Sequence, residues 1–215
     1  NTASIIKTFY SMGAKKVKYP ERVVIILDHC VPAQDEKYAK NHWEIRRFVE
    51  KEEIENFFDI NEGICHQVFS EQGFAIPGKL IMGSDSHTTT YGAFGAFSFA
   101  IGRSETSAIY ATGEMWLKVP ESMKITLSGL FKKGVYIKDL ILHIIGEIGQ
   151  DGATYLSVEL GGDALKNISI SERMTFANMK AEMGAKNCFI QTDEETRRWL
   201  NDKNKENYSE IFPDK

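Results

Sequence analysis

The residues of this chain best suited to chemistry are an acid, a hydroxyl and an imidazole in near succession: Asp85, Ser86 and His87. They follow an apolar run at 79–82 and precede a bend of glycine and small residues at 92–96. Polar groups just beyond the end of a buried strand lie where open α/β sheets bind ligands. A turn whose Asp and Ser side chains hydrogen-bond to nearby backbone would explain the same residues. This stretch alone leaves both interpretations open.

Two further histidines lie at or just after strand-like runs. Residues 22–27 form a β-branched and aliphatic run, typical of a strand covered on both faces, and lead into Asp28 and His29. Residues 54–60 predict another strand, which leads to His66. A single buried histidine is more often a core residue than a catalyst. Three histidines near the ends of neighbouring strands, two of them close to an aspartate, favour a shared site.

Strands and helices alternate along the chain, which predicts an α/β fold with mixed or parallel sheets flanked by helices. We expect helices at 3–12, 36–51, 104–117, 137–148 and 172–183, and strands at 22–27, 54–60, 80–82, 124–128 and 154–159. Pro120 restricts the residue before it to extended backbone. We therefore predict a first domain at 1–119, a second at 120–200 and a polar linker at 201–215.

The two remaining histidines lie within predicted helices and carry no site signal. The helix at 36–51 is amphipathic, with four residues expected to face inward: Trp43, Ile45, Phe48 and Val49. His42, beside them, is interpreted as a solvated or packing residue. His143 is interpreted as a core or surface residue of the helix at 137–148.

Length and composition describe an ordinary globular protein of 215 residues with a formal net charge of −4. The pI of about 5.8 argues against a nucleic-acid-binding surface. No apolar run reaches the roughly 18 residues that a membrane span requires. The three cysteines, Cys30, Cys65 and Cys188, are odd in number and scattered, unlike a secreted disulfide framework. We therefore expect a cytoplasmic protein.

Six separated motifs occur in the order seen in the aconitase superfamily, which the chain resembles as far as about residue 200. They are Asp28-His29, 63–67, Pro77-Gly78 with 83–88, 110–114, 151–155 and 178–184. In style they resemble the large subunits of the isopropylmalate dehydratase branch, with homoaconitase next. The resemblance implies two three-layer α/β/α units of the aconitase domain 1 and 2 type.

The activity implied by the resemblance is removal and readdition of water on a hydroxy di- or tricarboxylic acid. The substrates would be 2-isopropylmalate and 3-isopropylmalate, in leucine biosynthesis, with homoaconitate or another aconitase-type acid as the alternative. His87 and the Asp28-His29 pair would then lie around the departing hydroxyl. Asp85 would bind iron-bound water, and Ser86 would lie near a substrate carboxylate.

Asn178 and Glu182 stand four residues apart on a predicted helix, so they share one face. A solvated polar face would explain them equally well from spacing alone. The resemblance implies that both contact the site from the second domain, with Asn178 binding substrate. It also implies that Glu182 pairs with His66 of the first domain, where each group would shift the pKa of the other.

The family's [4Fe-4S] cluster is held by one isolated cysteine and a Cys-x-x-Cys pair, and its open iron polarises the hydroxyl. This chain contains no Cys-x-x-Cys. Neighbouring side chains in extended backbone point to opposite faces, so Cys30 and Cys65 should face packing if His29 and His66 face a site. We expect no cluster bound to this chain alone, and cluster ligands in a further domain.

The start without methionine and the polar segment after residue 200 lead us to expect an inactive fragment of a longer enzyme. By resemblance, its partner is a small subunit that carries the mobile swivel domain and the serine base. Two other classes stay open. One is a zinc hydrolase using Asp85, His87, His29, His66 and Glu182 as ligands, and the other is a cluster-free binding or assembly module.

Overall fold

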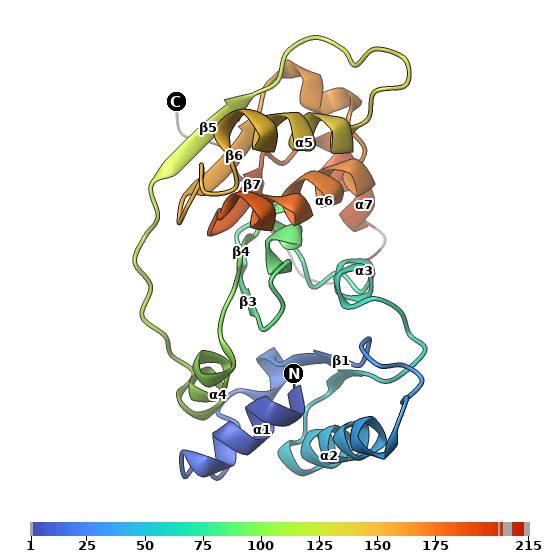
Figure 1. Ribbon diagram of the computed structural model, residues 1–215, viewed down its shortest axis with the longest axis vertical. Coiled ribbons are helices and arrows are strands. Elements are labelled where there is room, and N and C mark those ends of the chain that lie inside the picture. The colour runs from blue at the N-terminus through green and yellow to red at the C-terminus, as the bar shows by residue number, and fades with distance from the viewer. Residues whose placement is uncertain (1, 202, 204–207, 213–215) are drawn as a thin grey trace. The chain divides into compact units, whose positions relative to one another are not determined.

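The computed structural model describes residues 2–201, 203 and 208–212. The chain divides into two compact units (Figure 1). The first unit comprises Asn1–Val68 and Ile101–Leu117, and the second comprises Phe69–Ala100 and Lys118–Lys215. By this division the segment 69–100, which the prediction assigned to the first domain, lies in the second unit.

The first unit contains one pair of parallel strands and three α-helices that lie wholly within it. The strands are β1 (Val24–Ile26) and β2 (Asn56–Phe58), and the helices are α1 (Thr2–Ser11), α2 (Glu36–Glu52) and α4 (Arg103–Thr112), with a 3-10 turn η1 at Pro20–Arg22. Phe9 of α1 packs edge-to-face on Phe48 of α2, with 5.8 Å between ring centroids. These rings and Ile25 of β1 belong to one buried cluster.

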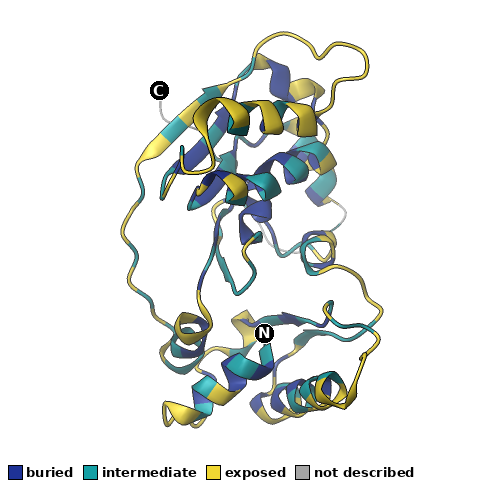
Figure 2. Ribbon diagram, in the orientation of Figure 1, coloured by how far each residue is buried: buried dark blue, intermediate teal, exposed yellow. Residues whose placement is uncertain are grey.

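Helix α2 forms where predicted, but its inner face differs from the prediction by one residue. Its start is capped by the Asp35 carboxylate, which accepts from the backbone N of Tyr38 at 2.9 Å. Ile45 and Phe48 are buried as expected, whereas Trp43 is 53% exposed, which corrects the expectation that it faces inward. His42 occupies the buried position instead, because it lies three residues before Ile45 on the same face. Figure 2 shows this division along α2.

The second unit contains a three-stranded parallel sheet and a separate parallel pair. The sheet runs β5 (Ser122–Thr126), β6 (Ser157–Gly161), β7 (Asn187–Ile190), and the pair is β3 (Leu80–Gly83) with β4 (Phe97–Ala100). Its helices are α5 (Ile137–Ile148), α6 (Ile170–Asn178) and α7 (Glu194–Asn201), with 3-10 segments η2 (Thr88–Phe94), η3 (Asp163–Asn167) and η4 (Met179–Met183). Helices α5 and α6 pack side by side against the sheet (Figure 1). The α/β class with parallel strands is confirmed.

The segment 69–100 joins the second unit because η2 packs against α6 and β7. The approach to β7 is very close. A Cβ added at Gly92 would lie 1.6 Å from the carbonyl oxygen of Cys188. Only a glycine fits there, so the sequence Tyr-Gly-Ala in this stretch marks an internal packing contact as well as a bend.

Several element ends differ from prediction for local backbone reasons. Helix α4 ends at Thr112 and not at 117, because Gly113 is left-handed at φ 74° and a Cβ there would lie 2.3 Å from the Tyr19 ring. Strand β6 begins three residues late, after Tyr155 at φ 60°. The helix predicted at 172–183 is α6 followed by η4, and it does end at Gly184.

Of the predicted linker, residues 202, 204–207 and 213–215 lie outside the described residues. The described part near Ile211 is bonded to the second unit: its backbone N donates to Thr192 Oγ1 at 3.0 Å, and the Thr192 hydroxyl donates to its carbonyl at 3.1 Å. Across the described part of the chain, no helix combines the length and the apolar character needed to cross a membrane.

Candidate active site

The Asp-Ser-His turn follows β3 in the second unit and is fixed by its own backbone. The Asp85 carboxylate accepts from the backbone N of His87 at 2.8 Å, and the Thr88 hydroxyl donates to the Asp85 carbonyl at 2.7 Å. Gly83 permits this fold, because a Cβ there would lie 2.4 Å from Thr88 Oγ1. These are the local bonds that the turn interpretation predicts. They hold the side chain of His87 in a defined place, so the turn and a site are compatible.

His87 has a polar neighbour at each ring nitrogen. Its Nδ1 lies 3.0 Å from Ser86 Oγ, and its Nε2 lies 3.4 Å from Oε1 of Glu182 in η4. If the Ser86 hydroxyl donates to Nδ1, the neutral ring carries its proton on Nε2 and presents it to the Glu182 carboxylate. The imidazole is partly exposed. It is therefore both oriented and within reach of a small molecule.

A run of buried threonines ties this turn to the end of α6. Thr88, Thr89 and Thr90 are each 2% exposed. The Thr89 hydroxyl donates to the Ala177 carbonyl at 2.9 Å, and the Thr90 hydroxyl donates to the His87 carbonyl at 2.6 Å. The sequence alone predicted no role for these residues. Three threonines directly after His87 could have indicated a hydrogen-bonded support of the turn, because a buried hydroxyl must find a partner.

Asn178 and Glu182 both meet the Asp-Ser-His turn, although not along one α-helix. Asn178 is the last residue of α6, and its Nδ2 donates to Thr90 Oγ1 at 2.9 Å. Glu182 follows in the 3-10 segment η4 and reaches His87. We expected His66 as the partner of Glu182. A pairing with His87 of its own unit was not foreseen, and the pairing with His66 stays a prediction.

In the first unit, Asp28 connects the end of β1 to the start of α3 (Cys65–Glu71). Its Oδ1 lies 2.6 Å from Nδ1 of His29, and its Oδ2 accepts from the backbone N of Cys65 at 2.7 Å. Burial alone would raise the pKa of Asp28, but the hydrogen bonds from Cys65 and His29 outweigh it and lower the pKa below its usual value. Asp28 is thus a carboxylate at neutral pH that holds the largely exposed imidazole of His29.

The backbone at the motif cysteines is not extended, which corrects the reasoning that their side chains oppose those of the histidines. Cys30 is left-handed at φ 56°, and Cys65 and His66 open the helix α3. Cys30 and Cys65 are half-buried, whereas Cys188 is fully buried. Burial raises the pKa of Cys188 to about 12. It is therefore a neutral thiol inside the core of the second unit.

No metal centre is assembled from the residues described in 2–201, 203 and 208–212: they contain no group of three His, Cys, Asp or Glu side chains placed to hold an ion. The three cysteines come from three separate elements, the turn after β1, α3 and β7. They lack the Cys-x-x-Cys pair that the family resemblance implies for the ligands of its cluster.

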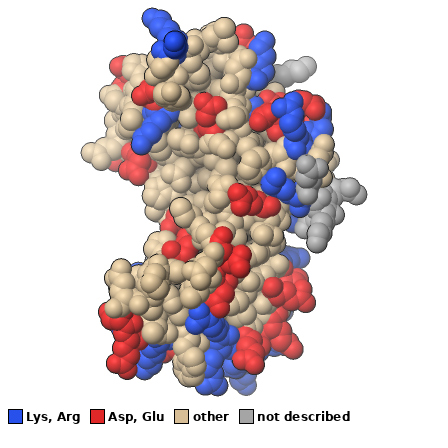
Figure 3. Space-filling view, turned by 90° about the vertical axis from the view of Figure 1, so that its right-hand side faces the viewer, with Lys and Arg blue, Asp and Glu red and all other residues tan. Residues whose placement is uncertain are grey.

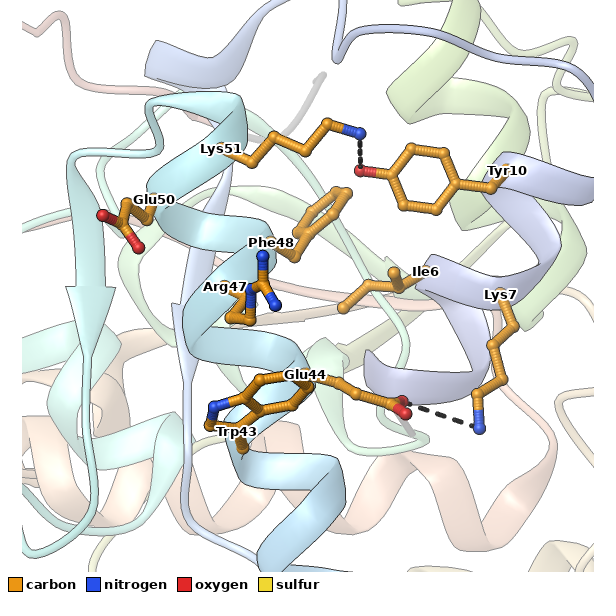
Figure 4. A pocket seen from close by; sticks show the side chains of 9 residues that line it. All are labelled: Ile6, Lys7, Tyr10, Trp43, Glu44, Arg47, Phe48, Glu50 and Lys51. Carbon is orange, nitrogen blue, oxygen red and sulfur yellow. Dashed lines mark hydrogen bonds and ion pairs between the residues drawn. The ribbon is translucent and has the colours of Figure 1, made fainter.

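A shallow recess between α1 and α2 is unrelated to these residues (Figure 4). Its floor is apolar, with Ile6 and Phe48, and on its rim Lys7 pairs with Glu44 at 3.6 Å. Lys51 donates to the hydroxyl of Tyr10 at 2.9 Å. On the face shown in Figure 3, acidic and basic side chains are interspersed, in keeping with the small net charge.

Comparison with known proteins gives a family match over nearly the whole chain. The model of the aconitase family (aconitate hydratase) matches residues 2–212. The chain is 43% identical over 195 residues to a probable 3-isopropylmalate dehydratase large subunit of Methanothermobacter thermautotrophicus, covering 91% of the chain and 46% of that protein.

Two further relatives are similar to the same degree. A probable methanogen homoaconitase large subunit of Methanosarcina mazei is 46% identical over 97% of the chain and 54% of its own length. The 3-isopropylmalate dehydratase large subunit of Aquifex aeolicus is 46% identical over 91% of the chain and 45% of its own length. The chain thus spans about half the length of the curated relatives that it matches.

Proposed function

Because the chain belongs to the aconitase family, we propose that it supplies acid–base and substrate-binding groups to a hydro-lyase that interconverts 2-isopropylmalate and 3-isopropylmalate. This would be the isomerisation, by loss and return of water, of leucine biosynthesis. The observation that carries the proposal is the junction in the second unit, where His87 meets Glu182 and Asn178 donates to Thr90, whose hydroxyl donates to the His87 carbonyl.

The chemistry needs a proton at the departing hydroxyl, because hydroxide is a poor leaving group. His87 and Glu182 form a pair that can hold one proton between an imidazole nitrogen and a carboxylate oxygen, 3.4 Å apart. The partly exposed ring can pass this proton to a substrate oxygen and take one back when water returns. Ser86 and Asn178, beside the pair, are proposed to bind substrate oxygens.

The first unit is proposed to contribute Asp28, His29 and His66 to the same reaction. The ionised Asp28 fixes the Nδ1 side of His29, which leaves Nε2 of that ring for a substrate oxygen. Asp85 is proposed to act on water, as the family resemblance implies. Each of these roles can be tested by substitution, because none of the residues belongs to a hydrophobic core.

Membership of the family implies a [4Fe-4S] cluster in the complete enzyme, where it supplies a Lewis acid. The cysteines described here do not fit as its ligands, because they contain no Cys-x-x-Cys pair and Cys188 is enclosed in the hydrophobic core. We therefore assign the ligands to the part of the enzyme beyond this chain. We further propose a small subunit, carrying the swivel domain, as the partner, and the cytoplasm as the location.

Homoaconitase is the second candidate, because the M. mazei homoaconitase large subunit is 46% identical over 97% of this chain. The discriminating experiment measures kcat/KM of the complete enzyme with its small subunit on 3-isopropylmalate and on homoaconitate. We expect 3-isopropylmalate to be preferred. Preference for homoaconitate would select the second candidate.

The same assay tests whether the junction is catalytic. We expect His87→Ala to lower kcat by at least about a hundredfold. His143→Ala, which changes an exposed histidine of α5, is the matched control and should leave kcat within about threefold. Wild-type activity on neither substrate, or a His87→Ala enzyme as active as the control, would contradict the proposal and favour a binding or assembly module.

A further inference from the structure

A buried histidine lies behind the Asp28-His29 turn. The Nε2 atom of His42 is 3.3 Å from the backbone carbonyl oxygen of His29. His42 comes from the inner face of α2 and is 7% exposed. It belongs to none of the six motifs and has no part in the proposed proton transfer.

The chemistry of this contact fixes the role of His42. A carbonyl oxygen only accepts hydrogen bonds, so Nε2 of His42 must carry a hydrogen and donate it. This holds for the neutral ring in one tautomer and for the protonated ring alike. A side chain of similar size without a donor would leave the carbonyl of His29 without this bond.

The backbone directly after His29 has an unfavourable conformation. Cys30 is left-handed at φ 56°, a conformation that disfavours residues with a Cβ. Such a turn persists when surrounding contacts over-determine it. The hydrogen bond from His42 connects this turn to α2, whose place in the unit is set by the buried side chains of Ile45 and Phe48.

Helix α2 also holds the neighbouring strand end. Arg46, four residues after His42, binds Asp59 with two hydrogen bonds of 2.7 and 2.8 Å, just beyond β2. One helix thus contacts the segments that follow β1 and β2, which are the segments that carry His29 and lead to His66.

We propose that His42 is a positioning residue: its Nε2–H fixes the carbonyl of His29 and thereby sets the direction of the His29 imidazole. The inference rests on the proposed function only in that His29 acts on substrate. His42 itself touches no substrate.

The test compares two variants of the complete enzyme. His42→Leu removes the donor, while His42→Gln retains an N–H near the position of Nε2. We expect His42→Leu to lower kcat at least about tenfold, the scale of a misplaced catalytic group, with KM changed less than about threefold. His42→Gln should restore kcat to within about threefold of wild type. His143→Leu serves as the control and should change neither parameter.

A second readout does not depend on turnover. In the enzyme labelled with ¹³C at histidine Cε1, the NMR signal of His29 is identified by its loss in His29→Gln. We expect this signal to shift in His42→Leu and to return in His42→Gln. An unchanged His29 signal in His42→Leu, or a glutamine variant as impaired as the leucine variant, would overturn the proposal. If wild type proved inactive on both acids while the signal responded as expected, the proposed function would fail and the positioning role would stand.

Discussion

The Nε2 atom of His87 and the Oε1 atom of Glu182 lie 3.4 Å apart, although 95 residues separate them in the chain. The two groups come from the turn after β3 and from η4, and both belong to the second unit. Their contact depends on buried hydrogen bonds and packing elsewhere in the second unit. Thr89 and Thr90 bond the turn to the end of α6, and the close contact of Gly92 with β7 holds η2 in place.

Gly92→Ala should therefore be strongly destabilising. A Cβ at this position would lie 1.6 Å from the carbonyl oxygen of Cys188, and a strand backbone cannot move far enough without cost. We expect a loss of at least about 3 kcal/mol in the free energy of unfolding, measured in urea. The control is Gly146→Ala in α5, where the added methyl meets nothing within 4 Å. It should stabilise the helix by about 0.5 to 1 kcal/mol. Equal stability of the two variants would show that η2 and β7 are not in this contact.

Lys180 should make the stability depend on pH. Its side chain is fully buried on the ring of Phe176, with the ammonium nitrogen 3.9 Å from the ring centroid, and burial lowers its pKa from 10.5 to about 8. Between these two values the unfolded chain binds more protons than the folded chain, so this residue adds stability as the pH rises. Below pH 8 the folded state bears the full cost of a buried charge.

Lys180→Met should then raise the free energy of unfolding at pH 7 by about 3 kcal/mol, the equivalent of the pKa shift. The advantage of the variant should shrink by about 1 kcal/mol when both proteins are measured at pH 9. Lys138→Met, at an exposed position of α5, is the control and should show no such change. An advantage that stays constant with pH would mean that Lys180 keeps an ordinary pKa.

Asp28→Asn tests the bridge between β1 and α3. The amide can accept from Cys65 or from His29 but cannot replace a carboxylate that accepts from both. We expect a loss of about 1 to 3 kcal/mol in the free energy of unfolding at neutral pH. Because the pKa of Asp28 is lowered in the folded state, this contribution is present above the usual aspartate pKa and is lost as the pH falls through the lowered value. A loss that persists in acid would indicate a packing effect of the amide.

Sequence patterns predicted some elements of the fold and missed others. The apolar runs before Asp28 and Asp85 predicted strands β1 and β3, because buried parallel strands have a recognisable composition. The same patterns missed β4, β7, α3 and α7. They also misjudged which of His42 and Trp43 faces the core. Amphipathic periodicity defines a helix face only to within one residue, and tertiary packing decides the rest.

Local sequence patterns did not predict contacts between residues that are far apart in the chain. The segment 69–100 was expected in the first domain, but η2 packs on α6 and β7 of the second unit. His87 of this segment lies beside Glu182 of the same unit. Spacing placed Asn178 and Glu182 on one helix face but left a solvated polar face equally open, and only the family resemblance implied a site. Asn178 donates to Thr90, and Glu182 lies beside His87. Spacing could not predict the contact of Glu182 with His87, because 95 residues separate the two in the chain.

The measurement that bears most directly on the proposed site is a double-mutant cycle of His87→Ala and Glu182→Ala in the complete enzyme, read as kcat at saturating substrate. If the two side chains share one proton, the first deletion removes most of what both contribute. We expect kcat of each single variant to fall at least about a hundredfold. The kcat of the double variant should be no more than about threefold below that of the less active single variant. A double variant that shows the full product of the two single losses would mean that His87 and Glu182 act independently, and the proton-sharing pair would have to be abandoned.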